Sequence, residues 1–262
     1  MSDRGFRFTN AAKLVIAFFI TVCPFSIAFA QSDSSIAVIN IATPAWENVT
    51  NEDGTGLYFD ILRSVYGPDG IALTFQIVPW RRAVEMVKQH QADALLGGYY
   101  IHPEKGGDLF PLYPIGGEVL AALSRKGAVS QWEGYQSIAG KVVVWIRGYN
   151  YHRYFDVHVN GREIDQEEQG WKLVESGRAD FYVENINFLN RYLRNSGIDR
   201  AGFDIHMLSS KPLFARFANT KKSEKLIEIY DARMPVLIAS GEIEKLFKKW
   251  GYPYPPFAPR TE

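Results

Sequence analysis

An alternation of strand-like and helix-like apolar patterns near the start of the chain constrains the fold most. Apolar runs predict strands at 36–42, 73–77 and 92–96. Between them, apolar residues recur at helical spacing over 58–65 and 80–87. The order strand, helix, strand, helix, strand predicts parallel strands joined by right-handed crossovers in an α/β fold. Because ligands of such sheets bind beyond the carboxyl ends of the strands, we expect the site in the loops that follow them.

A second series of the same kind follows Ser124. The sequence predicts strands at 141–146, 180–183 and 203–208, and helices at 166–176 and 186–193. Two such series within 262 residues are compatible with two lobes of similar construction.

Two helices are expected to close the chain. The last one is predicted by an apolar stripe at one-turn spacing, formed by Ile243, Leu246, Phe247 and Trp250. Pro235 is expected to kink or end the helix before it, because proline lacks the backbone N–H that a helix interior needs. The tail from 252 to 262 carries four prolines and is predicted to be irregular.

The first thirty residues have the pattern of an export signal. Arg4, Arg7 and Lys13 form a positive head, and the apolar run 14–22 follows it. Small residues then lead to a predicted cleavage site after Ala30. The apolar run is short for a membrane span, although an uncleaved N-terminal anchor is the alternative. We therefore expect a periplasmic protein.

Composition and motifs exclude several classes of function. Hydrophobic residues make up 47% of the chain and the formal net charge is zero, so nothing favours a nucleic-acid partner. Cys23 is the single cysteine and would leave with the signal. His152, Asp156 and His158 have no common zinc spacing, and no phosphate-binding glycine motif occurs. We expect neither a metal nor a cofactor.

Five stretches, in order, resemble the extracellular solute-binding protein family 3, which includes amino-acid receptors of ABC importers. They are 56–62 (GLYFDIL), 98–105 (GYYIHPEK), 138–144 (IAGKVVV), 175–180 (ESGRAD) and the closing 248–250 (KKW). No single stretch is specific, but the ordered set covers nearly the whole mature chain.

The resemblance implies a type II periplasmic-binding fold with two lobes. Each lobe is expected to be a mainly parallel sheet flanked by helices, and two hinge strands are expected to join them. The implied segments are lobe one over 34–123 and 213–254, lobe two over 124–212, and an irregular tail over 255–262. The hinges are expected near 123–124 and 208–212, and closure about them would enclose a ligand.

The resemblance also implies a ligand site in the first lobe. Trp46 follows the first strand and is expected to form a wall of the pocket, or else to pack under its own loop. Tyr99 and Tyr100 are expected to contribute hydroxyls and rings. Lys105 replaces the arginine that holds the ligand carboxylate in amino-acid receptors, and it is either a looser anion contact or a surface lysine.

In the second lobe, Gly148, Tyr149 and Asn150 occupy the position of a family turn whose backbone N–H groups receive a carboxylate. Asn185 or Glu184 occupies the place of the aspartate that holds the ligand's ammonium group. A shift of one residue decides which of the two faces the ligand. Arg147 and Arg81 are further candidate anion contacts.

These residues predict a monomeric periplasmic binding protein for a small polar, anionic or zwitterionic solute, with an ABC permease as the expected partner. The rival is a dehydratase on the same fold, with Glu184 or Glu47 as the acid and Lys105 as anion clamp. A third possibility is an orphan receptor that presents its ligand to a sensor.

Overall fold

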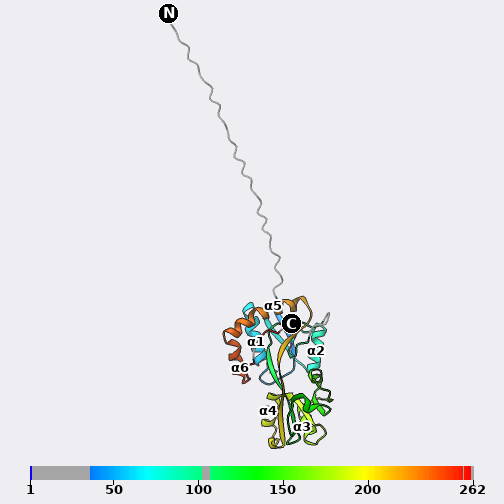
Figure 1. Cartoon of the computed structure of the whole chain (residues 1–262). Helices are drawn as coiled ribbons and strands as arrows, with labels where there is room; N and C mark the ends of the chain where they lie inside the picture. The colour runs from blue at the N-terminus through cyan, green and yellow to red at the C-terminus, as the bar shows by residue number, and fades with distance from the viewer. Residues whose placement is uncertain (2–35, 102–106, 256, 261–262) are drawn as a thin grey trace. The chain divides into compact units, whose positions relative to one another are not determined.

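One sheet of eight strands organises the protein. The computed structural model describes Met1 and residues 36–101, 107–255 and 257–260 (Figure 1). The strands lie in the order β2-β1-β3-β8-β4-β7-β5-β6. Their bounds are β1 Val38–Thr43, β2 Ala72–Ile77, β3 Ala94–Gly98, β4 Gly116–Arg125, β5 Val142–Ile146, β6 Asn160–Ile164, β7 Phe181–Asn185 and β8 Phe203–Phe217. The predicted signal segment, Cys23 and Lys105 lie outside the described residues.

Six α-helices accompany these strands in the described residues. Their bounds are α1 Leu57–Tyr66, α2 Trp80–Lys88, α3 Glu167–Glu175, α4 Ile186–Asn195, α5 Lys221–Ala239 and α6 Glu242–Trp250. A short 3-10 turn, η3 Tyr151–Tyr154, follows the loop after β5. Among the described residues, none of the helices combines the length and apolar character needed to cross a membrane.

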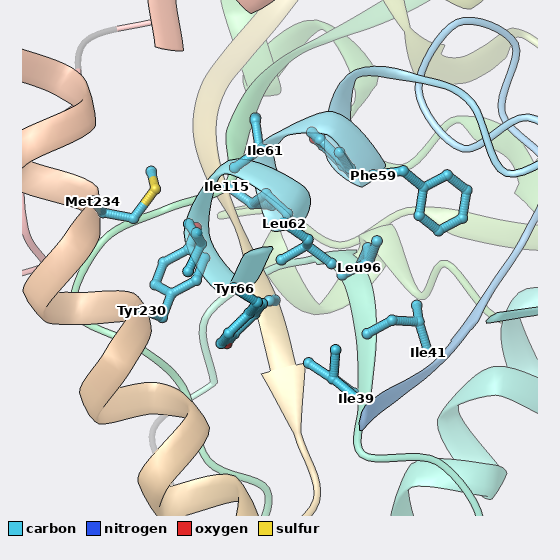
Figure 2. Packing of buried hydrophobic residues seen from close by; sticks show 14 of the residues in the cluster. Ile39, Ile41, Phe59, Ile61, Leu62, Tyr66, Leu96, Ile115, Tyr230 and Met234 are labelled. Atoms are coloured by element: carbon cyan, nitrogen blue, oxygen red, sulfur yellow. The ribbon is translucent and has the colours of Figure 1, made fainter. Parts of the chain in front are cut away.

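The half of the sheet around β1 has its own core. Strand β1 pairs in parallel with β2 and β3, and β3 pairs antiparallel with the end of β8. Helix α1 covers this half: Figure 2 shows Phe59 and Leu62 of α1 close to Ile39 and Ile41 of β1. Tyr230 of α5 packs in the same cluster. These side chains are at most 1% exposed, so burial of apolar surface holds the two helices to the strands.

The half of the sheet around β5 is built in the same way. Strand β5 pairs in parallel with β6 and β7, and helices α3 and α4 pack against this half of the sheet. Trp171 of α3 is 1% exposed at the centre of this second core.

Strands β4 and β8 connect the two halves as a long antiparallel pair, with a register shift between Leu120 and Ala121. Ala121 and Leu123 pack on one face of the β5 half, while Leu120 and Ala122 pack on the other. This alternation is the two-residue period of a strand buried on both faces.

The α/β class and the predicted strand–helix order are confirmed, with three differences. Strands β4 and β6 were not among the segments predicted from apolar pattern, and β8 extends to Phe217. Helix α5 continues past Pro235 to Ala239, so the helix does not end at the proline. The described part of the tail after Gly251 has no regular structure, as predicted.

Candidate functional site

A cavity of about 550 Å³ lies where loops from both halves of the sheet meet. It is lined by the loops after β1, β3 and β5, by helix α2 along its length, by the start of α4, and by β4. These are mainly segments beyond the carboxyl ends of parallel strands, where α/β folds place their ligands.

Most of the predicted site residues line this cavity. Those that do are Trp46, Tyr99, Gly148, Tyr149, Asn150, Glu184 and Asn185, together with Arg81. Tyr100 is not among the lining residues: its ring packs against Phe110 and Phe214, and Arg260 lies 4.7 Å from the ring centroid. Lys105 falls in the segment that the structure does not describe.

Arg147 is directed toward two carboxylates instead of the cavity. Its Nε donates to Asp165 Oδ1 at 2.6 Å, and its guanidinium lies 3.2 Å from Glu163 Oε2. These contacts raise the pKa of the guanidinium, chiefly through the hydrogen bond to Asp165. The geometry thus gives Arg147 two partners from its own half of the sheet.

Trp46 joins the two halves at the cavity. Its loop is closed by a bridge to Thr50, and its indole Nε1 donates to Tyr149 Oη at 3.2 Å. The ring lies 5.9 Å from that of Trp80. Gly97 makes room for this ring, because a Cβ there would lie 2.8 Å from Trp46 Cζ3, and φ of Gly97 is +79°. Both the left-handed backbone and the close approach therefore favour glycine.

The turn after β5 is hydrogen-bonded to side chains of the protein itself. Gly148 N donates to Glu163 Oε1 at 2.9 Å, so the backbone donor expected to receive a carboxylate is occupied. Asn150 Nδ2 donates to Gly148 O at 2.8 Å, and Asn150 itself is left-handed, with φ of 53°. A Cβ at Gly148 would lie 2.4 Å from Arg81 Cγ, which places α2 directly against this turn.

Glu184 and Asn185 both line the cavity, since strand β7 ends there and α4 begins. Glu184 is 2% exposed and accepts from the backbone N–H of Asn185 at 2.7 Å. The hydroxyls of Tyr151 and Tyr182 each lie 3.4 Å from its carboxylate oxygens. Asn185 caps α4 by accepting from Asn187 N at 2.9 Å. The turn from strand to helix lets both adjacent residues line one cavity.

A second carboxyl that pattern analysis did not select lies beside Glu184. Glu118 is on β4, half-buried, and its Oε2 accepts from Asn185 Nδ2 at 3.4 Å. Burial raises the pKa of the Glu118 carboxyl to about 7. Burial, with the negative charge of Glu118 as a further cause, raises the pKa of Glu184 to about 8. We call Glu118 and Glu184 the acidic pair.

The charged residues of the cavity differ in burial and in pairing. Within the described residues, neither member of the acidic pair forms an ion pair. Arg81, Lys88 and Arg153 also line the cavity, and all three are exposed. Glu85, Glu163 and Arg216 line the cavity as well, and Arg216 is paired with Asp108. The acidic pair is therefore largely buried and has no ion-pair partner among the described residues, while the exposed part of the cavity carries charges of both signs.

Aromatic side chains form much of the wall. Besides Trp46, Tyr99 and Tyr149, the cavity is lined by Tyr58, Trp80, Tyr151, Tyr154, Phe188 and Tyr252. The Trp80 and Tyr149 rings meet edge to face with centroids 6.2 Å apart.

Of the lining residues that the sequence analysis did not predict, Glu118 had the clearest signal, because it is a single acid within the apolar run 115–123.

No group of His, Cys, Asp or Glu side chains within the described residues is arranged to hold a metal ion. What the cavity offers is hydrogen bonding, charge and aromatic surface. Such a cavity, between loops of two α/β halves that one strand pair connects, defines the class of solute-binding proteins with a type II fold.

The sequence assigns the chain to a family within that class. Residues 36–253 match the model of the bacterial extracellular solute-binding proteins, family 3, and the chain belongs to this family. No curated protein sequence matches the chain.

Solved structures agree with the fold. The ligand-binding core of GluR0 from Nostoc punctiforme, in complex with L-glutamate, is 21% identical with a TM-score of 0.65, covering 82% of this chain and 100% of that one. An ancestral arginine-binding protein bound to arginine is 18% identical with a TM-score of 0.66, covering 82% and 99%. The ancestral amino-acid-binding protein AncCDT-1, a precursor of cyclohexadienyl dehydratase, is 17% identical with a TM-score of 0.62, covering 82% and 95%.

Proposed function

We propose that this solute-binding protein captures a small zwitterionic, amino-acid-like solute in the cavity. The observation that carries the proposal is that one aromatic-lined space holds both the acidic pair, which forms no ion pair among the described residues, and the exposed Arg81, which forms none with a described side chain. A solute with an ammonium group and a carboxylate would meet an opposite charge at each end. Aromatic faces would add cation–π attraction to the ammonium group.

Arg81 is the best-placed anion contact of the described residues. It lines the cavity against Gly148 and makes no ion pair with another described side chain, whereas Arg147 is bound to Asp165. Lys105 remains a proposed second contact. Its point charge would complement an arginine that offers a planar pair of donors.

Capture is proposed to proceed by closure of two lobes. Core membership favours a boundary on β4 before Leu120, because Ile115 belongs to the β1 core and Leu120 to the β5 side. This is a few residues earlier than 123–124. The contact of Trp46 with Tyr149 and the ion pair of Glu47 with Arg191, 3.2 Å, would then hold the closed state.

The protein is further proposed to act in the periplasm as a monomer, after removal of residues 1–30, and to deliver its solute to an ABC permease. The family's description as extracellular supports export. Structure-neighbour names that include amino acids support the ligand class.

A dehydratase is the second candidate, and one observation favours it. Burial raises the pKa of Glu184 to about 8, so at neutral pH this carboxyl holds a proton that it can donate. Glu47 is exposed and paired with Arg191, which makes it the weaker acid candidate. Product formation from prephenate by the wild type, absent in Glu184→Gln, would establish this reading.

The test is a thermal-shift screen of residues 31–262 against amino acids, dicarboxylates, amines and prephenate. A ligand at a hundred times its Kd stabilises the folded state by about 2.7 kcal/mol, which is readily measured. We expect a zwitterionic amino compound to give the largest shift, and Arg81→Gln to reduce it. A shift with dicarboxylates alone would contradict the proposal, because no cationic group would then contact the acidic pair.

A further inference from the structure

The acidic pair is held together by the fold, independently of any ligand. Strands β4 and β7 are antiparallel neighbours, with Ala121 opposite Glu184 and Leu120 opposite Asn185. Asn185 joins the two carboxyls, since its backbone N–H donates to Glu184 and its side chain donates to Glu118.

The groups around the pair supply little positive charge. Lys211 on β8 is the cation that acts on Glu118. On the side of α3, Glu184 faces the further acid Glu167, which lies 3.9 Å from Arg191 of α4. The other titratable neighbours are the neutral hydroxyls of Tyr58 on α1, of Tyr149, Tyr151 and Tyr154 after β5, and of Tyr182 on β7. Arg153 and Arg216 act on Tyr154, and Arg216 is paired with Asp108.

Two like charges that form no ion pair are costly in a buried place, and the usual outcome is that a proton stays on the site. A proton on one carboxyl lets the pair exist with a single negative charge. The positions of both pKa values, about 7 for Glu118 and about 8 for Glu184, agree with this state.

We propose that Glu118 and Glu184 act as one ammonium subsite, in which the cationic end of the solute replaces a shared proton. This deepens the proposed function and rests on it. In the exchange, a protonated carboxyl gives its proton to solvent and the resulting carboxylate accepts hydrogen bonds from the ammonium group. No covalent bond of the solute changes, and the net charge of the site is conserved. Glu118 thereby becomes a residue that determines specificity.

The subsite predicts a specific pH dependence. The affinity for amines should rise by up to about tenfold per unit of pH as pH rises from 7 to 8, because less work is then needed to remove the proton. The affinity for a solute of the same size without an ammonium group should not rise with pH.

The experiment has a ligand-free arm and a ligand arm. In the first, NMR of protein labelled with ¹³C at glutamate side-chain carboxyls follows titration of wild type, Glu118→Gln and Glu184→Gln. We expect Glu184 to titrate at lower pH in Glu118→Gln, because its neighbouring charge is gone. The exposed Glu175→Gln on α3 is the matched control and should leave Glu184 unchanged. An unchanged Glu184 titration in Glu118→Gln would overturn the shared proton.

In the second arm, calorimetry in phosphate and Tris buffers measures binding and proton release for four compounds with the same carbon chain: L-lysine, L-norleucine, ε-aminocaproate and caproate. We expect release of up to one proton with an ammonium compound that binds, and none with caproate. Glu118→Gln should abolish the release and weaken the amine roughly tenfold at about pH 8.

The two proposals fail separately. Amine binding without proton release, or with the same affinity in Glu118→Gln, would overturn the subsite and leave the proposed function standing. If none of the three ammonium compounds binds, both the proposed ligand class and the proposed exchange of an ammonium group for the proton are overturned. The carboxyl titration would still decide whether the empty pair shares a proton.

Discussion

Trp46 Nε1 donates a hydrogen bond to Tyr149 Oη at 3.2 Å, joining the loop after β1 to the turn after β5 across 103 residues of sequence. Trp80, at the start of α2, approaches both rings. Three aromatic residues from two loops and the start of one helix therefore form one wall of the cavity. Because they belong to different halves of the sheet, their contacts depend on how the halves meet, and substitutions there test closure directly.

Replacing Tyr149 with Phe should weaken ligand binding by roughly five- to tenfold, since one hydrogen bond contributes about 1 kcal/mol. The aromatic ring, and hence the packing, is retained. Tyr135→Phe is the matched control, because it loses a hydrogen bond to Ser209 outside the cavity. Isothermal titration of both variants with the ligand found in the screen checks this. Equal affinities in the two variants would show that the Trp46 contact does not assist capture.

A methyl group at Gly97 should disturb the site more than its backbone strain explains. Gly97→Ala places a Cβ 2.8 Å from Trp46, so the indole has to move. Gly127→Ala has a similar positive φ of +66° and open space around its Cβ. Both variants should lose roughly 1 kcal/mol of stability from the left-handed backbone, measured by urea unfolding. Ligand affinity should fall in Gly97→Ala only; a similar fall in Gly127→Ala would contradict the prediction.

The acidic pair should make the empty protein less stable as pH rises. A carboxyl with a raised pKa in the folded state binds more protons there than in the unfolded state between 4.5 and about 8. The stabilisation that this carboxyl contributes is therefore fully present below pH 4.5 and is lost as pH rises through about 8. The loss scales as about 1.4 kcal/mol for each unit of pKa shift.

Urea unfolding at about pH 5 and about pH 9 measures this loss. Glu184→Gln should flatten the profile, whereas Glu175→Gln should keep the wild-type slope. Because other groups also titrate in this window, the comparison is the difference between each variant and the wild type. An unaltered slope in Glu184→Gln would show that this carboxyl ionises without cost.

Two arginines near the cavity should differ in their effect on binding. Arg81→Gln removes a charge that lines the cavity and has no ionic partner among the described residues, so affinity for a zwitterion should fall roughly tenfold. Arg147 does not line the cavity, and Arg147→Gln breaks its ion pairs to Asp165 and Glu163, so affinity should change less than about threefold. If titration calorimetry shows a larger loss of affinity in Arg147→Gln than in Arg81→Gln, the anion contact is Arg147 and the prediction is wrong.

The apolar patterns of the sequence were sufficient for the α/β class and for most of the helices and strands. Helix α1, for example, lies between Gly56 and Gly67 as its apolar spacing and its Gly-Pro stop indicate. These features are local, because helix spacing and turn residues act over a few positions. Strand β6 escaped prediction because its exposed sequence NGREI has no apolar alternation.

The loops of the candidate site could also be located from sequence, since they follow predicted strands. Which side chains enter the cavity was decided by tertiary structure. Tyr99 lines it while Tyr100 packs on Phe110, and Arg147 is held away by Asp165. Adjacent residues share a local pattern, so only their distant neighbours distinguish them.

The acidic pair shows the same limit most clearly. Glu118 and Glu184 are 66 positions apart, and nothing near either one in sequence indicates the other. The antiparallel pairing of β4 with β7 brings them together, and burial by both halves of the sheet then raises their pKa values. The sequence by itself determined the fold class and the loops that carry the site. The charge and protonation of the site depend on desolvation and long-range pairing, which exist only once the chain has folded.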